Sequence, residues 1–119
     1  MSIQRQQFGK KGEMDAVTHL KRNGYRILEQ NYRTRLGEID IIAKDGKTIA
    51  FIEVKARKSN HFGNPKWAIT LKKQRNMSMT ALYYLKATHQ SREKARFDVV
   101  TIQSDRIEII KNAFELAYE

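Results

Sequence analysis

The sequence lacks cysteine, contains a single proline, and has no apolar run longer than a few residues. Without cysteine, disulfide bonds and thiolate metal sites are excluded, which fits a reducing compartment. The apolar runs are too short for a membrane-spanning helix, and the polar N-terminus has no secretory signal pattern. With no repeat, linker or low-complexity stretch, residues 1–119 are expected to form one cytoplasmic domain.

Acidic side chains are also scarce, because 23 Lys and Arg face 13 Asp and Glu, a formal net charge of +10. No acid occurs between Glu53 and Glu93, and surfaces usually mix both signs. That span contains nine basic residues: Lys55, Arg57, Lys58, Lys66, Lys72, Lys73, Arg75, Lys86 and Arg92. The pattern favours nucleic acid as a partner; a chance gap in a basic protein is the alternative.

Hydrophobic periodicity and breaker residues predict the order of the secondary structure. Helices are expected at 11–23 and 70–86, the first ended by Gly24. Strands are expected at 25–33, 38–44, 48–56, 96–102 and 106–110. Asn112 is expected to cap a short C-terminal helix. The order α-β-β-β-α-β-β-α predicts an α/β domain with a mixed β-sheet flanked by helices.

Two of the predicted strands carry acids inside apolar runs. The pair Asp45-Gly46 is a strong hairpin signal, and a tight turn there pairs Lys44 with Lys47. Because side chains alternate along a strand, this pairing puts Asp40 and Glu53 on the same face of the sheet. The two carboxylates are then at most one diagonal apart.

Two carboxylates held this close repel each other, and burial raises the pKa of at least one of them. Lys55, on the same face as Glu53, supplies part of the compensating charge, and a divalent ion supplies more. Oxygen ligands without His or Cys suit Mg²⁺ or Mn²⁺. The sequence therefore predicts a metal site at Asp40 and Glu53, and a surface cluster of ion pairs is the alternative.

A third acid, Glu13, lies on the apolar stripe of the first predicted helix. It precedes Val17 by four residues and Leu20 by seven, so all three lie on one face. A carboxylate on such a stripe needs a partner in the interior.

Five ordered blocks cover most of the chain: GKKGE from Gly9, GYRILEQNYR from Gly24, GEIDIIA from Gly37, FIEVKAR from Phe51 and RFDVV from Arg96. This pattern resembles the YraN family, small uncharacterised bacterial proteins related to archaeal Holliday-junction resolvases. Asp40 followed by Glu53-Val54-Lys55 resembles the PD-(D/E)xK nuclease motif, although Ile39 stands in the place of the motif's proline. The resemblance implies a restriction-endonuclease-like three-layer domain that hydrolyses DNA, including branched or junction DNA.

The resemblance also implies roles for single residues. The catalytic set falls on Glu13, Asp40, Glu53 and Lys55, with Lys55 orienting the attacking water or stabilising negative charge. Asp40, Glu53 and the Val54 carbonyl would bind Mg²⁺ or Mn²⁺, and Glu13 would bind a second ion or position the first through water. Candidates for phosphate contacts are Arg33, Arg35, Arg57, Lys72, Lys73 and Arg75.

The sequence allows two interpretations of Asp98, of three aromatic residues, of the substrate, of the oligomeric state and of the function. Asp98 is either a third acid of the site or the partner of Arg96 in a structural ion pair. Trp67, Tyr83 and Tyr84 either stack on bases or pack in the protein. DNA is the expected substrate and RNA the alternative, and both a monomer and a homodimer are compatible with the sequence. A nucleic-acid-binding module that keeps the nuclease architecture without cutting is the alternative function.

Overall fold

The computed structural model describes residues 3–57 and 69–117, and the side chains of 9–56 and 69–117. It contains, in chain order, α1 (Ile3–Arg22), β1 (Tyr25–Thr34), β2 (Gly37–Asp45), β3 (Thr48–Arg57), α2 (Leu71–Ala87), β4 (Lys94–Gln103) and β5 (Arg106–Phe114). All five strands and both long helices were predicted from the sequence. The first helix starts eight residues earlier than predicted, at Ile3 instead of Lys11.

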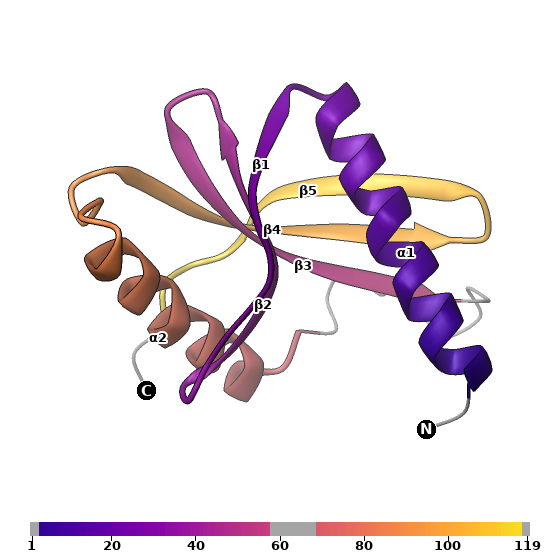
Figure 1. Ribbon diagram of the computed structural model, residues 1–119, viewed down its shortest axis with the longest axis horizontal. Coiled ribbons are helices and arrows are strands. Elements are labelled where there is room, and N and C mark those ends of the chain that lie inside the picture. Colours follow the sequence, from indigo (N-terminus) through magenta and orange to yellow (C-terminus); the bar gives the residue numbers. More distant parts are fainter. Residues whose placement is uncertain (1–2, 58–68, 118–119) are drawn as a thin grey trace.

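The five strands form one sheet in the order β1-β2-β3-β4-β5. Neighbouring strands are antiparallel except β3 and β4, which are parallel and are connected through α2. The two helices lie on opposite faces of the sheet (Figure 1). The prediction of a mixed sheet flanked by helices is therefore confirmed. Among the described residues, neither helix has the length and apolar character needed to cross a bilayer.

Both faces of the central strands are buried, so two apolar layers hold the domain together. On the α1 face, Ala16 and Leu20 pack against Ile41 and Ile52. On the α2 face, Met77, Ala81, Tyr84 and Leu85 pack against Ile39, Ile42, Ile49 and Phe51. Because side chains alternate along β2 and β3, each strand contributes residues to both layers. A polar residue in the middle of either strand therefore lies in the interior.

The turn between β2 and β3 differs from the predicted one by two residues of register. Asp45 pairs with Thr48 and Ile42 with Phe51, so Gly46 and Lys47 form the turn. Gly46 has φ +62, a value that glycine adopts without strain at the first position of a two-residue hairpin turn. A shift of two residues leaves Asp40 and Glu53 on a common face, as predicted, whereas Ile39 packs in the same layer as Ile42 and not with Ile41.

The predicted C-terminal helix is wrong. Asn112 lies inside β5 with φ +56, and its N–H donates to Asp98 Oδ1 at 2.9 Å. Phe114 stacks on Phe97 with ring centroids 4.7 Å apart, which holds the end of β5 against β4. Among the described residues after Phe114, 115–117 form neither helix nor strand. Asn adopts a positive φ more readily than most residues, which explains its presence at this position of β5. It does not cap a helix.

Candidate active site

The candidate site begins where β2 and β3 separate. Their paired register runs from Asp45–Thr48 to Ile41–Ile52, and Asp40 is the next residue of β2. Its Oδ2 accepts a hydrogen bond of 2.8 Å from the Val54 N–H. A carboxylate thus takes the place of a backbone acceptor at this point. Because the N–H and C=O of an extended residue project to the same strand edge, the Val54 carbonyl also faces the β2 side.

Glu53 is buried beside Asp40. Its side chain is 9% exposed, and its Oε1 has no hydrogen-bond partner among the described residues. Burial, followed by the negative charge of Asp40, raises the pKa of Glu53 to about 8. The prediction that Asp40 and Glu53 share one face is borne out, and without an added cation Glu53 holds a proton at neutral pH.

Lys73 of α2 is the nearest described cation of this pair. Its Nζ lies 3.7 Å from Glu53 Oε1, too long for a hydrogen bond but close enough for electrostatic attraction. Both Lys73 and Lys55 oppose the rise in the pKa of Glu53, and Lys73 has the larger effect. The sequence assigned Lys73 to phosphate contact and missed this place beside Glu53. The sequence did contain a signal for this place. The first turn of α2 has no acid that could pair with Lys73, so its partner had to come from another element.

Glu13 approaches Asp40 from α1. Its side chain is half-buried, and its pKa is raised by burial and then by the charge of Asp40. A side-chain hydrogen bond with Asn31 opposes that rise. Gly12 allows the approach, because a Cβ there would lie 3.0 Å from Ala56 Cβ on β3. Asp40 therefore lies within electrostatic reach of both Glu13 on α1 and Glu53 on β3.

Asn31 is a member of this region that the sequence analysis missed. It is in β1 with φ +53, a backbone conformation in which Asn is enriched. With Glu13 and Arg33 it lines a cavity of about 360 Å³. The polar interruption at 29–31 in an otherwise regular strand pattern was the signal that could have identified it.

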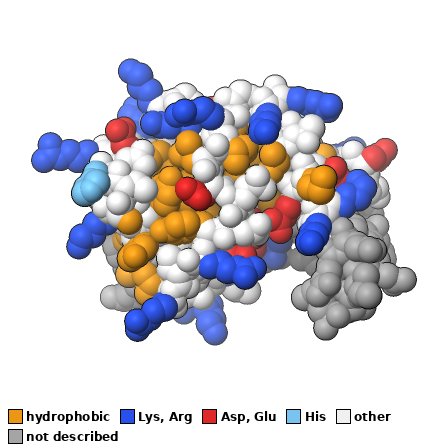
Figure 2. All heavy atoms as spheres, viewed as in Figure 1, with side chains coloured by type: hydrophobic (Ala, Val, Ile, Leu, Met, Phe, Trp, Pro, Cys, Tyr) orange, Lys and Arg blue, Asp and Glu red, His pale blue; other side chains and the backbone are white. Residues whose placement is uncertain are grey.

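The predicted phosphate-contact residues fall into two groups. Arg33 and Arg35 lie at the end of the β1–β2 hairpin, whereas Lys72, Lys73 and Arg75 lie in the first turns of α2. Arg33 forms an ion pair of 3.1 Å with Glu38, which accounts for that surface acid. The Arg57 side chain lies outside the described residues. On the face viewed in Figure 2, Lys and Arg side chains lie mostly along the margins, around apolar side chains.

Asp98 does not belong to the site. It is fully buried and accepts hydrogen bonds from Arg96 at 2.7 and 2.8 Å, from the Tyr25 hydroxyl at 2.9 Å and from the Asn112 N–H. Arg96 also donates to Asp45, so the cluster links β1, β2, β4 and β5. The structural alternative for Asp98 is confirmed.

The oxygen ligands available for an ion are few. Within the described parts of the chain, no group of three or more Asp, Glu, His or Cys side chains is arranged to hold a metal ion. Asp40 and Glu53, with the Val54 carbonyl, are the set that the geometry offers. The unpartnered Glu53 Oε1 and the all-oxygen donor set fit a hard divalent cation.

Comparison with known proteins identifies the family. Residues 12–102 match the uncharacterised protein family UPF0102. The chain belongs to UPF0102. A UPF0102 protein of Desulfosudis oleivorans is 53% identical over 97% of this chain and 95% of its own length, and one of Geobacter metallireducens is 53% identical over 99% and 100%. These matches confirm the YraN-like family, and the relation to PD-(D/E)xK nucleases stays a prediction.

Proposed function

We propose that this UPF0102 protein is a metal-dependent nuclease that hydrolyses DNA phosphodiesters, including those of branched DNA. The observation that carries the proposal is Glu53 Oε1, a buried oxygen without a hydrogen-bond partner among the described residues, beside a second carboxylate. Such a pair costs stability unless a cation joins it. Strongly perturbed acids that come together at the edge of a fold are frequent in catalytic sites.

Asp40, Glu53 and the Val54 carbonyl are the proposed ligands, with Glu13 on the Asp40 side. When bound there, Mg²⁺ or Mn²⁺ supplies positive charge that offsets the charge developing on the phosphate. Glu53 would lose its proton when such an ion is held there, because the ion would replace the proton as the balancing charge.

The remaining roles belong to side chains around the pair. Lys55, half-buried on the same strand as Glu53, orients the attacking water or stabilises the negative charge on the phosphate oxygens. Asn31 and Glu13 hold each other by a hydrogen bond and fix the α1 side of the site. Arg33, Arg35, Lys72 and Arg75 contact the flanking phosphates, and this binding is largely independent of base sequence.

A specific observation favours the non-catalytic alternative. Lys73 already lies near Glu53, so the chain supplies part of the missing positive charge itself. A nucleic-acid-binding module could keep Glu53 buried and protonated beside Asp40, with that lysine offsetting the remaining negative charge. The two functions differ in whether the pair takes up a metal ion.

Metal binding is the first test. We expect titration calorimetry with Mn²⁺ to show uptake by the wild type and none by Glu53→Gln, because the amide offers no charge to the ion. Glu38→Gln is the matched control, since Glu38 forms an ion pair with Arg33 and is not a proposed ligand. Equal uptake by all three proteins would remove the site from consideration.

Cleavage is the second test. Wild-type protein with Mg²⁺ or Mn²⁺ is assayed on linear, nicked, flapped and four-way DNA. We expect Lys55→Ala to cut roughly 10²–10³-fold more slowly, as for the loss of one donor that stabilises the transition state. Its DNA affinity should stay nearly unchanged, because one of many basic residues contributes little. Lys47→Ala, at the exposed β2–β3 turn, is the control. Absence of cleavage by the wild type on every substrate would favour the binding module.

A further inference from the structure

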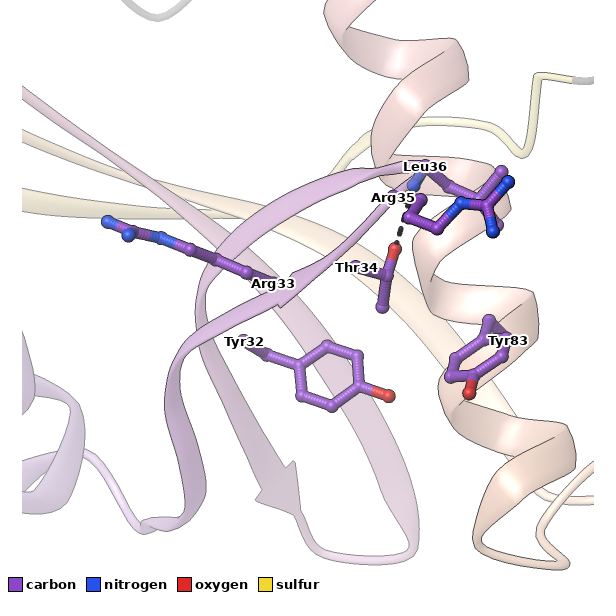
Figure 3. Close-up of a pocket in the computed structure, with 6 residues that line it drawn as sticks. All are labelled: Tyr32, Arg33, Thr34, Arg35, Leu36 and Tyr83. Carbon is purple, nitrogen blue, oxygen red and sulfur yellow. Dashed lines mark hydrogen bonds between the residues drawn. The ribbon is translucent and has the colours of Figure 1, made fainter.

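A second cavity lies away from the carboxylates, between the β1–β2 turn and α2. Its volume is about 620 Å³, within the range of ligand pockets. The residues that line it are Tyr32, Arg33, Thr34, Arg35, Leu36 and Tyr83. Figure 3 shows the Tyr32 ring extending from β1 toward Tyr83 on α2, Arg35 beside Leu36 at the turn, and Arg33 pointing away from the tyrosines. Neither Asp40 nor Glu53 lines this cavity, although Arg33 and Arg35 are among the residues proposed to contact flanking phosphates.

The walls of the cavity are held in place. Gly37 lets the hairpin pack closely on α2, because a Cβ there would lie 3.0 Å from Asn76 Cβ. Thr34 Oγ1 accepts a hydrogen bond of 3.0 Å from the Leu36 N–H and fixes the turn. Tyr32 packs edge-on against the buried Tyr84, with ring centroids 5.2 Å apart. The cavity is therefore pre-formed.

Its exposed side chains contribute little to the fold. Tyr83 is 53% exposed, whereas the adjacent Tyr84 is 5% exposed and packs in the core. Leu36 is 44% exposed. Arg35 forms no ion pair or side-chain hydrogen bond with any described residue. An aromatic ring, an apolar side chain and an unpaired guanidinium thus face one space that no acid lines.

We propose that this cavity binds one unpaired nucleotide of a single-stranded nucleic acid. The base stacks on Tyr83, and its phosphate binds Arg35. Aromatic rings beside a positive groove are the usual means of holding single strands, because every base has a face that can stack. In a duplex the base faces are already stacked on their neighbours, so the site selects an unpaired strand.

This inference names a substrate class for the proposed nuclease, and that consequence depends on the proposed function. Arg33 lines both this cavity and the one beside Glu13 and Asn31. A strand held at Tyr83 therefore passes Arg33 on the way to the carboxylates. The preferred substrate would carry an unpaired stretch next to the phosphodiester that is cut.

The test is direct binding without metal, so that no cutting occurs. Fluorescence anisotropy in EDTA measures a labelled oligothymidine of about 12 nucleotides, within the usual site size of single-strand binders, and a duplex of equal length. We expect Tyr83→Ala to weaken oligothymidine binding roughly 5- to 100-fold, the loss that follows removal of one stacking ring. Tyr83→Phe, which keeps the ring, should bind like the wild type, and Tyr83→Ala should not change duplex affinity.

The charge contribution has its own matched pair. Arg35→Gln should weaken oligothymidine binding more than Arg106→Gln, which removes an exposed arginine at the β4–β5 turn, on the other side of the domain (Figure 1). Tyr83 is exposed, and circular dichroism will verify that its variants fold. Equal effects of the two arginine changes would overturn the assignment of Arg35.

Other results would overturn the site itself. If Tyr83→Ala weakens duplex and single strand alike, or neither, the cavity does not select unpaired nucleotides. If the wild type does not bind oligothymidine but sediments as a dimer that Tyr83→Ala dissociates, the occupant is a second copy of this chain. Single-strand binding that depends on Tyr83, in a protein that cuts nothing, would support this site and overturn the nuclease proposal alone.

Discussion

Two buried carboxylates lie on neighbouring strands of one sheet, and their surroundings differ completely. Asp98 on β4 accepts four hydrogen bonds, two of them from the guanidinium of Arg96. Glu53 on β3 has one oxygen with no hydrogen-bond partner among the described residues, and its nearest cation, Lys73, stays 3.7 Å away. β3 and β4 run parallel, and Ile52 beside Glu53 pairs with Asp98.

The comparison teaches that burial alone does not mark a functional acid. Asp98 is less exposed than Glu53, yet its charge is balanced and its hydrogen bonds come from the chain itself. Glu53 is left with a second carboxylate as its neighbour, so it is stable in the interior only with a proton or an added cation. The acid whose surroundings are incomplete is therefore the candidate for chemistry.

The largest expected effect is on stability, from isosteric changes at the two acids. Asp98→Asn should lower the free energy of unfolding by about 3–5 kcal/mol, because Arg96 loses the charge of its buried partner. Glu53→Gln should leave it unchanged or raise it, since an amide suits that site without metal. Urea denaturation at neutral pH in EDTA measures both. Equal losses would mean that the two acids are structural in the same way.

The second largest expected effect is on the pH dependence of stability, which should differ between Glu53 and the hydrogen-bonded cluster around Asp98. Because the pKa of Glu53 is raised to about 8, the folded protein keeps a proton that the unfolded chain releases near pH 4.5. The free energy of unfolding should therefore fall between about pH 5 and pH 8, by roughly 2–4 kcal/mol. Glu53→Gln should lose this slope, and a slope that persists in the variant would place the titration elsewhere.

The hydrogen-bonded cluster around Asp98, which includes Arg96 and Asp45, should change the stability of the protein at acidic pH instead. Hydrogen bonds from Arg96 and Lys111 hold the pKa of Asp45 below its ordinary value. The stability that Asp45 contributes is thus present above the ordinary pKa of Asp and is lost as the pH falls through the lowered pKa. Glu53→Gln leaves this acid limb in place, which is the internal control of the same titration.

The smallest expected effects come from the lysine of each cluster. Lys111→Gln removes an ion pair of 3.0 Å with Asp45, but the lysine side chain is 54% exposed, so the loss should be below about 1 kcal/mol. Lys73→Gln should change stability at neutral pH even less, because Glu53 holds a proton there. Its signature is a higher midpoint of the Glu53 titration, since Lys73 lowers that pKa. An unchanged midpoint would show that Lys73 does not act on Glu53.

Much of the fold follows from local patterns. Alternation in β2 and β3 predicts that Asp40 and Glu53 share a face, and a two-residue error of register leaves that result intact. The helical stripe of α1 likewise predicts that Glu13 points inward. These inferences hold because strand and helix periods fix side-chain direction without knowledge of the neighbours.

Other features depend on contacts that no local pattern encodes. Lys73 reaches Glu53 only because α2 packs across β2, and its approach is set by Gly37 against Asn76. The stripe of Met77, Ala81 and Tyr84 buries one tyrosine and exposes the other, which the pair of adjacent tyrosines does not reveal. The sequence analysis interpreted Asn112 as a helix cap. Its actual hydrogen bond, to Asp98, joins two strands that only the folded chain brings together, so no local pattern could reveal it.

The sheet topology also has a consequence for the order in which the molecule assembles. Asn31, Asp40 and Glu53 come from three consecutive strands joined by two-residue turns, whereas the Tyr25–Asp98 hydrogen bond joins residues 73 positions apart. Short loops close at lower entropic cost than long ones, and non-local parallel pairing is slow. The carboxylate pair therefore belongs to the part of the chain that leaves the ribosome first and pairs early. We expect the hydrogen bonds of Asp98 to form later, because they need β4 to pair with β3 and β5 to pair with β4.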